Sequence, residues 1–316
     1  MTQSIPFGAR STADQVLAGV DLNRKRMVVT GCDRGIGLEI MKALVANGAH
    51  VIGLARTHED ARAACNAAGT SSTPIACDLA DFASIDFAAD SICELPGPLD
   101  AVITNAQRIG PAGPTRRHGA ELTFIVDYVG HFALVNRLVD RVRGNRGRIV
   151  MMSGEVSMNH SPTQPATLDN LDDRHVYEPL VSYGQARSAN AIYAKELSRR
   201  LAPRGVTVNS WGATAGARLA RHRNWAQRLV YPVARLFMKS AAQSAATAAL
   251  LAASPLVGGI SGEYWSNCQI TRGDPLLGDE VLAKRFWDAS EQIVATISAA
   301  HRVAPQAMPK NSAARA

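Results

Sequence analysis

The sequence predicts an α/β fold in which a single doubly wound parallel sheet carries helices on both faces. Strand-like runs alternate with helical runs along most of the chain, a glycine-rich turn follows the first strand, and short Gly/Pro segments separate the elements. The 316 residues are 47% hydrophobic and 19% charged, which fits one large globular core. The chain is therefore expected to form one main domain.

Each element is predicted from its local pattern. Apolar, β-branched runs bounded by turn residues predict strands at 26–31, 49–56, 73–79, 98–106, 147–154, 206–212 and 262–267. Helical periodicity predicts helices at 35–48, 58–69, 80–95, 122–142, 181–205 and 279–297. We expect an N-terminal arm over 1–25, the main domain over 26–297 with a substrate-covering lid at 218–240, and a flexible tail over 298–316.

Charge and cysteine content exclude several classes of protein. Lys and Arg number 34 against 27 Asp and Glu, a net charge of +7 that suits a small anionic ligand. Aromatic residues make up only 5% of the chain and no dense basic stripe stands out, so no nucleic-acid partner is expected. The five cysteines include no CxxC pair and no Cys/His cluster, which argues against disulfides and against any metal site.

No segment of the sequence predicts passage through a membrane. The first residues lack the apolar core of a secretory signal, and no window reaches 18 uncharged apolar residues. We expect a cytoplasmic protein. The segment 218–239 carries six Arg/Lys and no acid, and it could attract an anionic substrate, lie on a membrane surface, pack in an oligomer, or simply expose solvated arginines.

The turn after the first strand predicts a dinucleotide site. Gly31, Gly35 and Gly37 allow a tight turn and close approach to a pyrophosphate at the start of the following helix, and the intervening residues that would line this turn are Asp33, Arg34 and Ile36. Arg56 closes the second strand, where an Asp or Glu would select a free ribose 2′-hydroxyl. The cations Arg34 and Arg56 instead favour a 2′-phosphate, so NADP(H) is the expected cofactor.

These motifs resemble the short-chain dehydrogenase/reductase family, and most closely its retinol-dehydrogenase-like branch. The resemblance runs from about residue 7 to 297 and includes TGCDRGIG, CDL, Asn105-Ala106, YVGHFALVNRL and SYGQARSAN. It implies a Rossmann fold, adenine contacts from Asp78 and Leu79, and an adenosine-ribose wall at Asn105 and Ala106. It also allows a homodimer or homotetramer.

The resemblance breaks at the residues that would carry the reaction. The family uses Asn, Ser, Tyr and Lys, and this chain keeps only the tyrosine, Tyr183. The lysine position is Arg187, the serine position is Gly154, and the asparagine position is Asp127. Ser153 is adjacent to the serine position, but neighbouring strand side chains point to opposite faces. The glycine that usually follows Asn105-Ala106 is Gln107.

We interpret this distribution as a retained NADP(H) site with an altered reaction site. Tyr183 is the expected proton donor and Arg187 its electrostatic partner, both also touching the cofactor. Asp127 either pairs with Arg187 and serves as a general base, or is displaced and hydrated. Gly154, Trp211 and Trp225 are expected to line a pocket for a bulky apolar small molecule. His131 is expected to be a packed helix residue, and Lys195 lies too far along the helix to replace the missing lysine.

Three functions follow from this interpretation. The first is reduction of a carbonyl or activated double bond. The second is a non-redox reaction, by a cyclase, isomerase or dehydratase that keeps NADP(H) as a helper. The third is a catalytically silent nucleotide-sensing scaffold. A resemblance to halohydrin dehalogenases, which have a Ser-Tyr-Arg set on this fold, is weakened because those enzymes lack the nucleotide-binding glycines and this chain lacks their serine.

Overall fold

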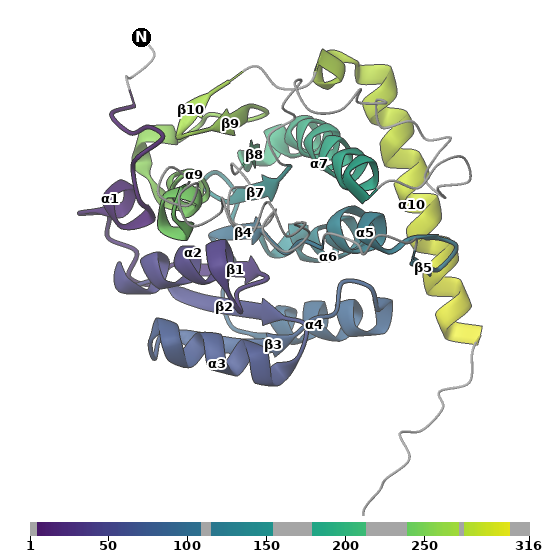
Figure 1. The fold of residues 1–316 in the computed structure, drawn as a ribbon, viewed down its shortest axis with the longest axis horizontal. Helices are drawn as coiled ribbons and strands as arrows, with labels where there is room; N and C mark the ends of the chain where they lie inside the picture. The colour runs from purple at the N-terminus through teal and green to yellow at the C-terminus, as the bar shows by residue number, and fades with distance from the viewer. Residues whose placement is uncertain (1–4, 109–114, 154–178, 213–238, 272–274, 304–316) are drawn as a thin grey trace, which may run out of the picture.

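A mostly parallel eight-stranded sheet forms the centre of the molecule (Figure 1). The computed structural model describes residues 5–108, 115–153, 179–212, 239–271 and 275–303. The sheet order is β10-β9-β8-β7-β4-β1-β2-β3, and only β10 runs antiparallel to its neighbour. The strands are β1 Arg26–Thr30, β2 His50–Ala55, β3 Ser72–Ala76, β4 Ala101–Thr104, β7 Arg148–Met152, β8 Thr207–Gly212, β9 Tyr264–Ser266 and β10 Gln269–Ile270. This topology confirms the predicted doubly wound parallel sheet.

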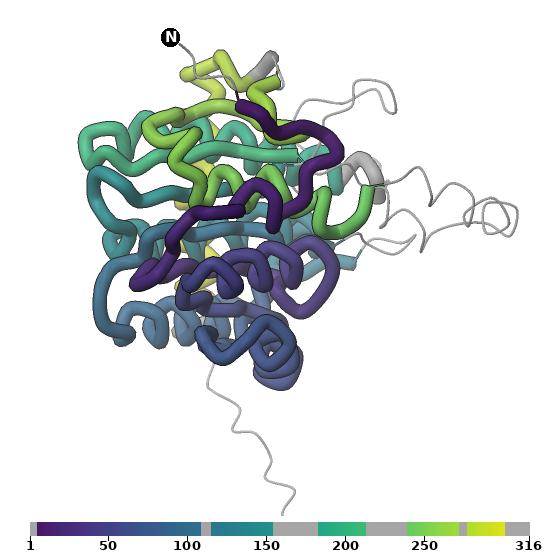
Figure 2. The backbone as a smooth tube through the Cα atoms, turned by 90° about the vertical axis from the view of Figure 1, so that its left-hand side faces the viewer, coloured from purple at the N-terminus to yellow at the C-terminus, as the bar shows by residue number. Residues whose placement is uncertain are grey.

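Helices cover both faces of the sheet, which explains why its strands are apolar on both sides. Successive strand residues alternate between two buried clusters, as Met27, Val28 and Val29 do in β1. One cluster packs under α1 Ala13–Leu17, α2 Gly35–Ala46, α3 His58–Ala68 and α9 Ala241–Ala253. The other packs under α4 Phe82–Glu94, α6 Gly130–Leu138, α7 Pro179–Leu201 and α10 Glu280–Val303. Figure 2 shows the same layers from the side.

All seven predicted strands are present, and each predicted helix has a counterpart. Two α-helices of the described residues were missed, α1 and α9, and both begin with a capping box in which Thr12 pairs with Gln15 and Ser240 with Gln243. The alanine-rich α9 is buried along most of its length, so it lacks the polar face that periodicity detects. The capping box of Ser240 and Gln243 was the sequence signal that could have predicted where α9 begins.

The predicted helix over 122–142 is not continuous. It consists of α5 Leu122–Phe124, a π-helical turn η1 Ile125–Val129, α6, and a 3-10 turn η2 Val139–Arg141. The π turn contains Asp127, and such turns commonly occur at functional sites. The segment Leu122–Arg141 is long and apolar enough to cross a bilayer, but 72% of its most apolar window is buried inside the protein. It is therefore a core helix.

The first and last described helices, α1 and α10, lie on the outside of these layers (Figure 1). Within the predicted arm, α1 packs against α9 through Ala13, Val16 and Leu17. At the other end, α10 continues to Val303, past the predicted domain limit at 297. Most of the predicted lid (218–238) and the final residues 304–316 lie outside the described residues.

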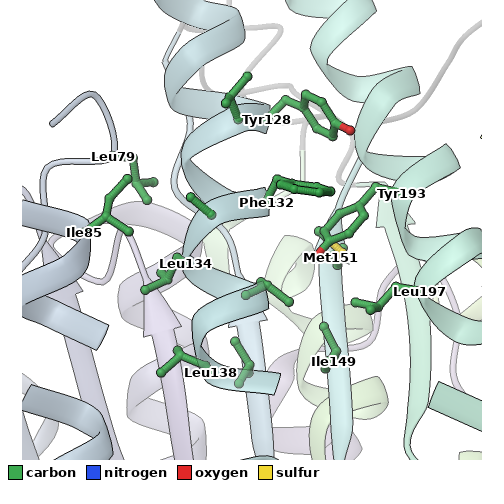
Figure 3. Packing of buried hydrophobic residues seen from close by; sticks show 14 of the residues in the cluster. Leu79, Ile85, Tyr128, Phe132, Leu134, Leu138, Ile149, Met151, Tyr193 and Leu197 are labelled. Carbon is green, nitrogen blue, oxygen red and sulfur yellow. The ribbon is translucent and has the colours of Figure 1, made fainter. Parts of the chain in front are cut away.

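Aromatic packing fixes α6 against α7 (Figure 3). The rings of Phe132 and Tyr193 lie 4.8 Å apart between centroids, and both contact Trp287 of α10. Ile149 and Met151 of β7 lie beneath these rings. Because α6 follows Asp127 directly and α7 carries Tyr183, this packing sets the distance between the two predicted reaction-site residues.

Candidate functional site

The glycine turn after β1 packs directly against the end of β4. Gly31 has φ +64°, its N–H donates to the Leu54 carbonyl at 2.8 Å, and an added Cβ would lie 2.7 Å from the Cα of Ala106. An added Cβ on Gly37 would overlap the Gly31 carbonyl and the Asn105 amide nitrogen. Only glycines allow this close approach of the turn, the helix and the loop after β4, residues 105–108, called the β4 loop.

The start of α2 has no side-chain cap. Arg34 occupies the N-cap with an extended backbone and makes no capping hydrogen bond, whereas Thr57 and Asp81 cap α3 and α4. Gly35 has φ +57°, and the position that its Cβ would occupy is open space. The first N–H groups of α2 therefore have no side-chain cap, and the open space beside Gly35 forms a cradle next to them, as a helix that binds a phosphate requires.

Thr30 ties this cradle to the β4 loop. Its hydroxyl oxygen accepts the N–H groups of Asn105 at 2.9 Å and Ala106 at 3.0 Å, and it lies 2.9 Å from Nε2 of His131. Since the oxygen already accepts two N–H groups, its own proton points to His131, which must accept it. The side-chain amide of Asn105 donates to the carbonyls of Thr30 and Gly31, and its Oδ1 is a buried acceptor with no partner among the described residues.

His131 is the neutral member of this network. Its Nδ1 lies 3.1 Å from the carbonyl oxygen of Asp127, so the ring proton lies on Nδ1 and the Thr30 hydroxyl donates to Nε2. Burial lowers the pKa of His131 to about 4, with the Arg187 charge acting in the same direction. The ring is therefore a neutral structural bridge at neutral pH. The sequence predicted a packed helix residue, and His131 is buried, but its hydrogen bonds to Thr30 and Asp127 were not predicted.

The residues predicted to select the nucleotide gather at the carboxyl edge of β1, β2 and β3. The exposed Arg34 lies 3.5 Å from the half-buried Asp33, and Arg56 is exposed just beyond β2. Asp78 accepts the Ala80 N–H at 3.0 Å and lies 4.0 Å from Arg117. These side chains face solvent or are half-buried.

Two predicted nucleotide contacts have little exposed side chain. The Leu79 side chain is buried against Ile85 (Figure 3), so only its backbone could meet an adenine. Asn105 is completely buried, while the Ile36 and Ala106 side chains are half-buried beside the turn. The turn and the β4 loop thus form one continuous wall.

Asp127 and Arg187 form a buried ion pair. The Arg187 Nη2 donates to Asp127 Oδ2 at 3.1 Å, and their side chains are 3% and 0% exposed. Arg187 Nη1 donates to the Met152 carbonyl at 3.2 Å, and Asp127 Oδ1 accepts the Arg108 N–H at 2.6 Å. The pair therefore links α7, β7, the π turn and the β4 loop. Because Asp127 is buried and both its oxygens hold hydrogen bonds, this geometry supports a holding role rather than proton transfer.

Tyr183 lies at the accessible end of this arrangement. Its hydroxyl donates to the side-chain oxygen of Gln107 at 3.1 Å, and both residues are half-buried. The guanidinium carbon of Arg187 lies 4.5 Å from the centre of the Tyr183 ring. Arg187 therefore contacts the ring face, while the hydroxyl points to the β4 loop.

The structure does not bring every predicted residue to this site. Trp211 is completely buried in the cluster beneath α2 and α9, and Ser153 is also buried, with its hydroxyl donating to the Trp211 carbonyl at 3.3 Å. Gly154 and Trp225 lie outside the described residues. Within the described ranges, no group of three or more His, Cys, Asp or Glu could hold a metal ion.

Sequence reasoning did not assign a role to Gln107, Thr30 or Asn190. Asn190 donates its side-chain amide to the Asp127 carbonyl at 2.7 Å, one helical turn past Arg187. Gln107 was visible as a departure from a glycine directly after Asn105-Ala106. This replacement of a glycine by a polar side chain was the sequence signal that could have pointed to Gln107 as a site residue.

The chain is similar to proteins of one family. Residues 25–166 match the short chain dehydrogenase family. The WW domain-containing oxidoreductase of Homo sapiens is 31% identical over 302 residues, which cover 91% of this chain and 72% of that protein. An oxidoreductase of Streptomyces lividans is 33% identical over 298 residues, covering 85% of this chain and 97% of that protein. Short-chain dehydrogenase TIC 32 B of Brassica napus is 28% identical over 311 residues, covering 91% and 94%.

Solved structures share the fold. A crystal structure of an uncharacterized protein from Mycobacterium Paratuberculosis matches with a TM-score of 0.65 and 22% identity, over 90% of this chain and 97% of that one. A dehydrogenase/reductase from Sinorhizobium meliloti 1021 matches with a TM-score of 0.59 and 22% identity, over 80% and 95%. These two structures show the fold alone. The relatives that are 31% and 33% identical, together with the matched family model, show that the chain belongs to the short-chain dehydrogenase/reductase family, whose members generally bind NAD(P)(H).

Proposed function

We propose that this protein is an NADP(H)-dependent reductase of a carbonyl or activated double bond in a bulky apolar small molecule. The observation that carries the proposal is the uncapped start of α2 beside Gly31, Gly35 and Gly37. This turn packs against the β4 loop, in which the Gln107 side chain accepts the hydrogen bond of the Tyr183 hydroxyl. Nucleotide cradle and proton donor thus adjoin the same loop.

The residues of the cradle fit a dinucleotide. The uncapped N–H groups of α2 would hold the diphosphate, and the unpartnered Oδ1 of Asn105 is a buried acceptor that suits a ribose hydroxyl. Arg34 and Arg56 are exposed cations at the edge where a 2′-phosphate would lie, which favours NADP(H) over NAD(H). Asp78 is the candidate partner for the adenine amine.

The reaction needs a hydride and a proton. When bound, a reduced nicotinamide would supply the hydride to the electrophilic carbon. Tyr183 donates its hydroxyl proton to the substrate oxygen, which becomes an alcohol, and solvent restores the proton. Arg187 holds the ring through its face and is itself held by Asp127 and the Met152 carbonyl. The apolar character of the substrate rests on the aromatic residues of the 218–240 segment.

One observation favours a second candidate function. The guanidinium charge of Arg187 is balanced by Asp127 at 3.1 Å and lies over the ring rather than beside the hydroxyl. The pair as a whole is neutral, so it supports a tyrosinate less than an isolated cation would. A non-redox enzyme of this fold, using Tyr183 as a hydrogen-bond donor with NADP(H) bound as a helper, would suit that arrangement.

Nucleotide titration and turnover test the proposal together. Purified protein is titrated by calorimetry with NADPH, NADP+, NADH and NAD+, then supplied with NADPH and a panel of apolar ketones, quinones and enones. Tight binding of the phosphorylated pair, with NADPH absorbance lost in proportion to product and abolished by Tyr183→Phe, supports the reductase. Product without loss of NADPH supports the non-redox enzyme. Binding without any product favours a nucleotide-sensing scaffold, and no binding overturns the nucleotide site.

A further inference from the structure

Among the described residues, the part of the reaction site that a ligand can reach consists of two side chains on different elements. Of the four residues that form the arrangement, Asp127 and Arg187 are buried, whereas Tyr183 and Gln107 are half-buried. The Tyr183 hydroxyl and the Gln107 side-chain oxygen lie 3.1 Å apart. Any oxygen that receives the Tyr183 hydrogen bond must therefore replace the Gln107 oxygen and remain within reach of the Gln107 carboxamide.

The backbone of Gln107 is held on both sides. The N–H of Ala106 donates to the Thr30 hydroxyl at 3.0 Å, and the N–H of Arg108 donates to Asp127 Oδ1 at 2.6 Å. Asp127 is in turn fixed by Arg187. A side chain on so constrained a backbone meets a ligand in a defined place, which is the condition for specific recognition.

Neither the sequence at the serine position nor the described residue beside it supplies a second side-chain hydrogen-bond donor. That position is Gly154, which has no side chain, and the adjacent Ser153 is buried with its hydroxyl on the Trp211 carbonyl. A carboxamide carries an acceptor and two donor hydrogens, and rotating it by half a turn exchanges the two ends. Gln107 can therefore present N–H where it now presents oxygen.

We propose that Gln107 is a substrate-binding residue, whose carboxamide N–H and the Tyr183 hydroxyl together bind the carbonyl oxygen of an apolar ketone or quinone. On binding, the Tyr183 hydroxyl transfers its hydrogen bond from Gln107 to the ligand, and the amide turns to donate a second one. This inference deepens the proposed function and takes the reacting carbonyl from it. The Gln107 amide, on the β4 loop, would then replace the hydrogen-bond donor that is missing at the serine position.

Equilibrium binding tests the inference without turnover. Protein saturated with NADP+, which cannot reduce the ligand, is titrated with phenanthrenequinone by calorimetry. Removing one neutral hydrogen bond in Gln107→Ala should weaken quinone binding about fivefold, with NADP+ affinity unchanged. Gln292→Ala, an exposed glutamine on α10, should leave both affinities at their wild-type values.

Gln107→Glu separates a donor from a merely space-filling side chain. Its carboxylate has the size of the amide but no hydrogen to donate, so quinone binding should weaken at neutral pH. As the pH falls and the carboxyl group takes up a proton, its O–H can donate and affinity should recover. Arg108, Tyr183 and the Asp127–Arg187 pair are ionisable groups near position 107 in the described structure. They are shared by all variants, so recovery is measured against Gln107→Ala at each pH.

Turnover with NADPH then separates this inference from the proposed function. Losing an oxygen-binding donor in the transition state should lower kcat/KM for the quinone about 100-fold in Gln107→Ala. Equal quinone affinity in wild type and both variants, no quinone binding by the loaded wild type, or faster turnover in Gln107→Ala would each overturn the role of Gln107. Binding that depends on Gln107 without NADPH oxidation would instead refute the reductase and leave the role of Gln107 standing.

Discussion

Asp127 and Arg187 lie 3.1 Å apart with almost no exposed surface, and each also binds a backbone group of a different segment. Asp127 accepts the Arg108 N–H, and Arg187 donates to the Met152 carbonyl. The carbonyl oxygen of Asp127 accepts hydrogen bonds from Nδ1 of His131 and from the side-chain amide of Asn190. One ion pair thus connects the β4 loop, β7, the π turn and α7, which are the segments that position Tyr183 and Gln107.

Breaking this pair should destabilise the protein strongly. Asp127→Asn keeps the shape of the side chain but leaves Arg187 as an uncompensated buried charge, so we expect a loss of about 3–5 kcal/mol in the free energy of unfolding. Urea unfolding at neutral pH measures it. The exposed pair of Asp140 with Arg204 at 2.9 Å provides the control, because Asp140→Asn should cost less than about 1 kcal/mol.

The double variant Asp127→Asn with Arg187→Lys tests whether the two substitutions form one unit. It recreates the Asn and Lys of the family pattern, so its loss should be at least about 1 kcal/mol smaller than the sum of the two single losses. Simple additivity would show that each residue acts alone and that the ion pair adds nothing to stability.

Two glycines of the turn should respond differently to alanine. A methyl on Gly37 would overlap the Gly31 carbonyl and the Asn105 amide, so Gly37→Ala should lower the free energy of unfolding by about 1–3 kcal/mol. At Gly35 the added methyl meets no protein atom but enters the cradle, and φ of +57° costs about 1 kcal/mol. Gly35→Ala should therefore fold but bind NADPH weakly.

Calorimetric titration together with thermal unfolding distinguishes these outcomes. Gly278→Ala, where the methyl meets open space, is the control for a glycine outside the turn. If Gly35→Ala bound NADPH as tightly as the wild type, the start of α2 would not be the phosphate site.

Reversing the charge at Arg56 should change nucleotide preference. Arg56 is exposed directly after β2, and a charge-assisted hydrogen bond to a 2′-phosphate is worth enough that Arg56→Asp should weaken NADPH binding about 10- to 100-fold. NADH has no 2′-phosphate and should lose little. Arg62→Asp, the same charge reversal on an exposed face of α3, corrects for the change in net charge. Equal losses for NADPH and NADH would refute the NADP(H) assignment.

The sequence predicted the sheet because each strand is a short apolar run closed by a turn residue, and both faces of every central strand are buried. It missed α9 because an alanine-rich helix buried along most of its length has no polar face for periodicity to reveal. It predicted one continuous helix over 122–142 and missed the π turn within it, where the Asp127 carbonyl accepts hydrogen bonds from side chains of α6 and α7.

The reaction site was predictable in part. The Tyr183 and Arg187 spacing on one helix and the departure at Asp127 made an ion pair one of two alternatives, and the pair is what the structure contains. The sequence could not predict which atom accepts the hydrogen bond of the Tyr183 hydroxyl. That depends on the path of the β4 loop, which is set by the bonds of Thr30 and Asp127 to residues on either side of Gln107.

Burial of His131 should make stability depend on pH. Burial lowers the pKa of His131 to about 4, whereas in the unfolded chain the ring takes up a proton near 6.5. Between these values the unfolded state binds more protons than the folded state, so stability is complete above about pH 6.5 and falls as the pH drops toward 4. The expected loss between pH 7 and pH 5 is about 2 kcal/mol from this residue.

Urea unfolding across that range in wild type and His131→Gln isolates the contribution. The variant should be less stable at neutral pH, because the Thr30 bond is altered, yet should lose less on acidification. His50 is the control, because burial also lowers its pKa but it lies half-buried on β2, and His50→Gln should reduce the dependence less. The same loss on acidification in His131→Gln and wild type would mean that His131 is not the neutral bridge between Thr30 and Asp127.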